Sequence, residues 1–286
     1  MKCRIAVCLC VCILAGLLAT RSFAASTTQP TSDDGSRYLL TGKQLTAGPH
    51  HTHHAELFSR GVNGINLLVL RAIDRVQATA PDGGGYFIGV KAKPPESPIG
   101  YPLGLFGHAL LNPPRKTSYC SGSSYTAFIE TLNLLMPDAA ARLSPERLEA
   151  LRMQEPDGGR REDHVKFWGQ WNADGPGCQY ALVQYAKMGV VIDPKRARPG
   201  DFMNINWKSG NGHSTVFLGW HEDAQHVKSV LYWASQTGTN GLGDQLSKIE
   251  KIASVKIVRL TSPENLLTFD PATPVDDKVA GDPIDW

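Results

Sequence analysis

Cys120 stands where a cysteine nucleophile is easiest to activate, at the first turn of a predicted helix. A Pro- and Gly-rich stretch, residues 93–118, leads into it, and the small residues Ser121, Gly122 and Ser123 follow it. Unpaired backbone N–H groups and the helix dipole favour a thiolate at such a position. The same N–H groups can hold an oxyanion. The sequence therefore predicts Cys120 as a nucleophile for acyl transfer.

His213 is the predicted base for this nucleophile. It opens a strand pattern directly after the turn 210–212, so its ring is expected at a rim rather than in the middle of a core. A catalytic base also needs a third group that orients it. Ser235 and Gln236, at the end of the neighbouring predicted strand, are both candidates, and the sequence does not choose between them.

Three segments, in this order, resemble the NlpC-type papain-like cell-wall peptidases and the related CHAP amidases. They are Tyr119-Cys120-Ser121-Gly122 opening an apolar helix, Arg198-Pro199-Gly200-Asp201-Phe202 before a strand, and Gly212-His213-Ser214-Thr215-Val216 entering the next. The resemblance covers residues 64–245. It departs from the family at Tyr119, where many members have Asp, and in the long separation of Cys120 from His213.

This resemblance implies a papain-like α+β fold, with helices packed on an antiparallel sheet. It also implies hydrolysis of an amide bond in peptidoglycan, or in a similar substrate, by acylation of Cys120 with His213 as base. No cofactor and no metal are expected for this chemistry. The alternative function is a non-catalytic, secreted, wall-binding module that keeps the papain-like frame.

The two cysteines of the mature chain allow another interpretation. Cys120 and Cys178 are the only cysteines left once residues 1–24 are removed, so they could form a disulfide in an exported protein. A structural cysteine does not require a Ser-Gly-Ser helix start, however. Cys178 is therefore predicted to be a free, small, buried residue.

Four histidines, His50, His51, His53 and His54, lie within five residues. Such a tract could bind a divalent metal and would support a metal-dependent hydrolase as a third function class. No Cys, Asp or Glu pair stands nearby at a recognisable ligand spacing. The sequence therefore favours a tract that is exposed to solvent, or one that forms a surface near the active-site cleft.

The N-terminus is typical of a secretory signal peptide. Lys2 and Arg4 precede an apolar run, residues 5–18, and Ser22-Phe23-Ala24 fits a cleavage site. The run is shorter than the roughly 20 residues of a spanning helix. We therefore expect a secreted or periplasmic protein with no stable membrane anchor after cleavage.

Removing residues 1–24 takes away three basic residues and no acid, so the formal net charge falls from +2 to −1. A near-neutral chain gives no electrostatic case for nucleic acid as a partner. The expected organisation is a signal peptide (1–24), a flexible lead-in (25–48), a catalytic domain (49–270) and a loose C-terminal tail (271–286).

Periodicity of the apolar residues places helices first and strands after. Helices are predicted at 66–80, from Cys120 to Met136, from Pro145 and at 179–188. Strand patterns cover 202–207, 214–220, 227–233 and 255–260. This order is that of an α+β domain.

Overall fold

The computed structural model describes most of the chain that follows the predicted signal peptide. The described residues are 35–80, 84–87, 99–111, 117–152, 168, 178, 180–274 and 280–286. The predicted signal peptide, residues 25–34 of the lead-in, and residues 88–90 of a short strand expected after Tyr86 lie outside them. Residues Ser32–Trp286 form one compact unit.

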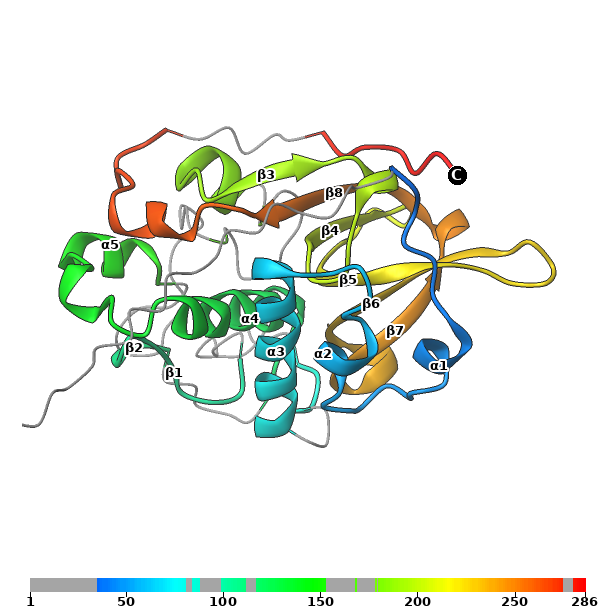
Figure 1. Ribbon diagram of the computed structural model, residues 1–286, viewed down its shortest axis with the longest axis horizontal. Coiled ribbons are helices and arrows are strands. Elements are labelled where there is room, and N and C mark those ends of the chain that lie inside the picture. Colours follow the sequence, from blue (N-terminus) through cyan, green and yellow to red (C-terminus); the bar gives the residue numbers. More distant parts are fainter. Residues whose placement is uncertain are drawn as a thin grey trace, which may run out of the picture. The chain divides into compact units, whose positions relative to one another are not determined.

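A six-stranded sheet forms the second half of this unit (Figure 1). All its neighbouring strands are antiparallel, in the order β3-β8-β4-β5-β6-β7. The strands are β3 (Gly189–Ile192), β4 (Phe202–Trp207), β5 (Gly212–Glu222), β6 (Lys228–Gln236), β7 (Gly241–Lys248) and β8 (Ile252–Leu260).

The first half supplies most of the helices. The two long ones, α3 (Gly64–Thr79) and α4 (Cys120–Leu135), pack against each other, and α4 also contacts β5 and β6. The shorter elements are α1 (Gly42–Leu45), α2 (His54–Leu57), α5 (Pro145–Ala150), a π-helical segment (Tyr180–Tyr185), and a hairpin of β1 (Leu103–Leu105) and β2 (His108–Leu111). The mixed α/β class and the antiparallel sheet predicted from the sequence are therefore confirmed.

Side-chain alternation gives the sheet two buried faces. On one face Val216 and Trp233 pack in the core that also contains the apolar residues of α3 and α4. Phe217, which follows Val216, and Tyr232, which precedes Trp233, lie on the other face. They belong to a second core built mainly from strand residues. Successive residues of a strand point to opposite faces, so the position of a residue along β5 or β6 decides whether it faces the helices.

Strand β7 was not predicted. Its first residues, Gly241–Gly243, pair with Ala234–Gln236. Two glycines and an aspartate give this strand poor intrinsic β propensity. Its formation depends on pairing with β6 and on the contacts of the N-terminal segment described below.

Both ends of the described chain contact the sheet. Leu39 forms a parallel bridge with Trp220, and Asp282 forms an antiparallel bridge with Val255. The Trp286 indole N–H donates to the Glu222 carboxylate at 3.0 Å. No helix in the described residues is both long enough and apolar enough to cross a membrane.

Candidate active site

Cys120 is the first residue of α4, as predicted. Tyr119 precedes it in an extended conformation, so the chain turns into the helix at Cys120. The side-chain hydroxyls of Ser123 and Ser124 donate to the Cys120 carbonyl at 2.8 and 3.2 Å. Cys120 is only 3% exposed. The thiol therefore lies at a helix start, in a small-residue environment that is largely closed to solvent.

Serine hydroxyls fix the start of α4 against β5 and β6. The hydroxyls of Ser124 and Ser214 are 2.7 Å apart, and the Ser235 backbone N–H donates to the Ser123 hydroxyl at 2.9 Å. Ser118, just before the helix, donates to the Ser235 hydroxyl at 2.7 Å. These contacts bring the start of the Cys120 helix to the ends of the two strands that carry His213 and Gln236.

The His213 ring is held by Gln236. Its Nε2 lies 3.1 Å from the Gln236 Oε1. The amide of Gln236 cannot turn freely, because its Nε2 donates to the Thr239 hydroxyl at 3.0 Å and to the Gly243 carbonyl at 2.9 Å. With the amide oxygen facing the ring, His213 must carry its proton on Nε2. Nδ1 is then the nitrogen whose lone pair can accept a proton.

Of the two candidates for the third group, only Gln236 contacts His213. The paired residues Phe217 and Tyr232 lie on one face of the sheet, and alternation along β5 and β6 places His213 and Gln236 on that same face. Ser235 points to the opposite face, where it holds Ser118 and Ser123. Ser235 thus fixes the helix, and Gln236 orients the imidazole.

The elements that carry Cys120 and His213, α4 and β5, pack against each other, and direct contact between the two side chains stays a prediction. Ser214 faces α4, so alternation turns His213 toward the other face, where its ring meets Tyr232 edge-on with centroids 5.5 Å apart. The Cys120 charge nevertheless reaches the same region: after burial, it is a cause of the raised pKa values of Tyr86 and Tyr232. Tyr232 is therefore influenced by both residues, through ring contact with His213 and through the charge of Cys120.

Burial keeps His213 neutral. It lowers the pKa of His213 to about 4, and the hydrogen bond that the ring donates to Gln236 only partly opposes this shift. Because an amide oxygen accepts without adding charge, it orients the ring without making it an imidazolium. At neutral pH the ring is thus in the form that a general base requires.

Cys178 and Cys120 are both buried and neither is in a disulfide, so the disulfide alternative is not formed in the structure. The Cys178 thiol donates to the Asn204 Oδ1 at 2.7 Å, on β4. Cys178 is therefore a small buried residue that helps to satisfy a buried amide, as the sequence predicted.

The histidine tract is not a solvated stretch, contrary to the sequence-based expectation. His54 is fully buried, and both its ring nitrogens meet carboxylates: Nδ1 lies 2.8 Å from Asp74 of α3, and Nε2 lies 3.0 Å from Asp244 of β7. His51 Nε2 meets the second oxygen of Asp244 at 3.0 Å. His50 and His53 are exposed, and 64% of the His53 side chain lies in solvent.

The charges of this buried group are mutually stabilised. Burial alone would lower the pKa of His54, but the carboxylates of Asp244 and Asp74 outweigh it and raise the pKa to about 9. Burial opposes the ionisation of Asp244 and Asp74, and His54 lowers the pKa of both. The sequence could not indicate this site, because about 190 residues separate His54 from Asp244.

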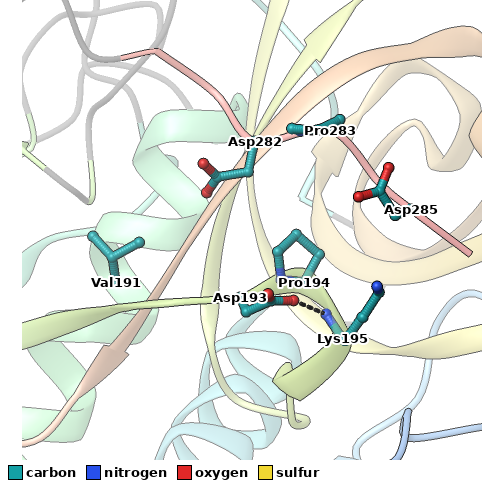
Figure 2. A pocket seen from close by; sticks show the side chains of 7 residues that line it. All are labelled: Val191, Asp193, Pro194, Lys195, Asp282, Pro283 and Asp285. Carbon is teal, nitrogen blue, oxygen red and sulfur yellow. Dashed lines mark hydrogen bonds between the residues drawn. The ribbon is translucent and has the colours of Figure 1, made fainter.

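A pocket of about 390 Å³ lies away from these residues, between the segment after β3 and the C-terminal residues (Figure 2). Asp193 and Asp282 line it, and both are already engaged: Asp193 accepts from the Lys195 backbone N–H, and Asp282 pairs with Lys256. None of the predicted catalytic residues lines this pocket, so it is not part of the candidate site.

The site thus consists of a buried thiol at a helix start and a neutral histidine held by a fixed glutamine amide at the adjacent strand ends. Comparisons with protein-family models, with curated proteins and with solved structures found no match. The chemistry of the site therefore has to be argued from its own residues.

Proposed function

We propose that this chain is an exported cysteine hydrolase of papain-like fold that cleaves an amide bond in peptidoglycan. Cys120 is the nucleophile, His213 the base, and Gln236 the residue that positions the base. The observation that carries the proposal is the bond between His213 and a glutamine amide that is itself fixed at both donors. The fixed amide supports the proposal because it sets the ring tautomer and leaves Nδ1 as the acceptor that a general base requires.

The proposed reaction follows from that tautomer. Once movement on substrate binding has brought Cys120 within reach of His213 Nδ1, the sulfur attacks the carbonyl carbon of the amide as its proton passes to that nitrogen. N–H groups at the start of α4 stabilise the oxyanion. The imidazolium then protonates the leaving amine, which yields a thioester on Cys120. Water attacks the thioester and gives a proton to Nδ1, and that proton returns to the thiol as the acid product leaves.

The substrate class rests on the three-segment resemblance and on export. Peptidoglycan lies outside the cytoplasmic membrane, where a chain with the predicted signal peptide would be released. The mature chain is near-neutral, so recognition is expected to depend on shape and on polar contacts rather than on strong electrostatic attraction.

A non-catalytic wall-binding module is the second candidate, and burial favours it. Cys120 is 3% exposed and His213 is 8% exposed. Hydrolysis requires that a substrate carbonyl reach the sulfur, so residues around Cys120 must move when substrate binds. A binding module needs no such movement.

The chain offers a matched pair of variants that separates these two candidates. Mature protein, with an N-terminus at Ala25 established by its mass, is incubated with peptidoglycan and the products are identified by mass spectrometry. We expect new amine and carboxyl ends, lost in Cys120→Ala and kept in Cys178→Ala, because only Cys120 lies at the proposed site. Wall binding without products from any of the three proteins would support the binding module instead.

Gln236 and Ser235 provide a second comparison. Gln236→Ala is expected to lower kcat at least about 10-fold, because the His213 ring loses its orienting acceptor. Gln236→Glu should keep an acceptor while its charge raises the pKa of His213, so the acid side of the pH–rate profile should move upward. Ser235→Ala should leave that profile in place. A shift of equal size in both variants would contradict a positioning role specific to Gln236.

A further inference from the structure

We propose that His51, His54 and Asp244 form a binding site for a divalent zinc-like cation, which fastens the N-terminal segment to strand β7. The ligand atoms of these three residues all lie within 4.8 Å of one another. Two imidazole nitrogens and a carboxylate are a ligand set that suits Zn²⁺, with a fourth position left for water. The inference concerns a different set of residues from the proposed catalytic group and does not depend on it.

Asp74 prepares His54 for this role. Its Oδ1 accepts from His54 Nδ1 at 2.8 Å, and the carboxylate is held in place by the backbone N–H groups of His54 and Ala55, at 2.7 and 3.0 Å. A carboxylate behind a histidine fixes its tautomer and directs the other nitrogen at the metal. Here that other nitrogen, Nε2, points at Asp244.

The charges of the group also favour a cation. Asp74 and Asp244 are both buried or nearly so, with 19% and 5% of their side chains exposed. In the metal-free form the Nε2 protons of His54 and His51 occupy the space between the rings and the Asp244 oxygens. A divalent cation in that space would balance the two carboxylates with both histidines neutral.

His51 is the ligand that must move. Its ring is stacked on His54, with centroids 4.2 Å apart, and its Nδ1 accepts the His53 backbone N–H at 3.2 Å. A ring bound to metal through Nε2 carries its proton on Nδ1, so this long hydrogen bond must open and the ring must turn toward the cation. The Nε2 proton of His54 leaves to solvent, while His51 transfers its proton from Nε2 to Nδ1.

The site would link parts of the chain that are distant in sequence. The segment from Pro49 already docks on β7, because the Asp244 backbone N–H donates to the Pro49 carbonyl at 2.8 Å and His50 Nδ1 lies 2.9 Å from the Leu242 carbonyl. A cation at His51, His54 and Asp244 would strengthen this docking. It would act as a cross-link in a chain whose two described cysteines form no disulfide.

The test measures zinc binding to the mature protein, purified without a histidine tag and freed of metal with a chelator. Calorimetry and metal analysis after gel filtration should give one Zn²⁺ per chain, and the melting temperature should rise with zinc concentration. His51→Ala and Asp244→Asn should weaken binding at least about 10-fold, whereas His53→Ala, a neighbouring exposed histidine, should not.

Two results would overturn the site. One is the absence of stoichiometric zinc binding in the unaltered protein. The other is binding that His53→Ala weakens as much as His51→Ala does, since this would indicate loose capture by surface histidines. His54→Ala is expected to fold poorly for reasons unrelated to metal, because it leaves two carboxylates without their partner. The decision therefore rests on His51→Ala, whose side chain meets only one carboxylate, that of Asp244. Metal content and melting temperature are measured without reference to hydrolysis, so either result stands apart from the proposed function.

Discussion

A His213→Ala variant is expected to hydrolyse peptidoglycan roughly 10²–10⁴-fold more slowly than the unaltered protein, the contribution usual for a general base. The loss should appear in kcat, because the ring accepts a proton only as the thiol attacks. Cys120 remains at the start of α4 in this variant, so slow residual acylation is possible. Initial rates of amine release from peptidoglycan, measured for folded variant and parent at equal concentrations, check the expectation.

The pH dependence of hydrolysis by the unaltered protein gives a second test of the role of His213. Burial lowers the pKa of His213 to about 4, so the neutral base persists in acid and is lost only as the pH falls through about 4. A histidine with the ordinary pKa of about 6.5 would cost roughly 25-fold in rate between pH 7 and pH 5. We expect almost no such loss from His213 in that interval.

The lowered pKa of His213 also makes the folded protein less stable in acid. Between pH 6.5 and 4 the unfolded chain protonates this histidine and the native chain does not, so the free energy of unfolding falls as the pH drops through that window.

His226→Ala is the matched control for rate and stability, because His226 lies beyond the end of β5 with 86% of its side chain in solvent. A rate that declines around pH 6.5, or a His213→Ala variant with unchanged kcat, would contradict the role of His213.

Local sequence patterns were sufficient for the elements that carry the candidate site. The start of α4 at Cys120 follows from small residues and an apolar stripe, and strand β4 has the predicted bounds, Phe202–Trp207. Such patterns depend on neighbouring residues only. They could therefore place a thiol at a helix start and a histidine at the beginning of a strand.

The choice between Ser235 and Gln236 needed the register of β5 against β6. Both residues are polar and adjacent, and a shift of one residue would exchange their faces. The bulge near Gly219 alters the register along the same pair of strands. Sequence alone does not fix the position of a bulge, so the residue that faces His213 could not be predicted.

Strand β7 and the buried ionic group of His51, His54, Asp74 and Asp244 were not predicted, for a related reason. Asp244 would be costly in a buried strand, unless a partner neutralised it. Its partners, His51 and His54, come from the N-terminal segment and are brought to it only by the folded chain. A contact between residues about 190 positions apart leaves no local pattern in the sequence. Neither strand β7 nor the burial of His54 could therefore be predicted.

His54→Ala is expected to destabilise the fold by about 3–5 kcal/mol, the cost of removing one partner from a buried ionic group. Both nitrogens of His54 contact carboxylates within 3.0 Å, and the ring has no exposed surface. Without it, Asp74 and Asp244 lose the partner that lowers their pKa values, and Asp244 remains buried. For a domain of this size, the loss corresponds to a fall in melting temperature of roughly 10 °C.

The measurement is chemical denaturation at pH 7 in the presence of a chelator, so that no bound cation contributes. His53→Ala is the matched control, because it removes the same kind of side chain from the neighbouring position. At that position 64% of the side chain is exposed to solvent. Its midpoint should equal that of the parent. If His54→Ala and His53→Ala unfold at the same denaturant concentration, the ionic group does not stabilise the fold. The docking of the N-terminal segment on β7 would then depend on its backbone contacts at Pro49 and on the apolar packing of Phe58, which is fully buried beside His54.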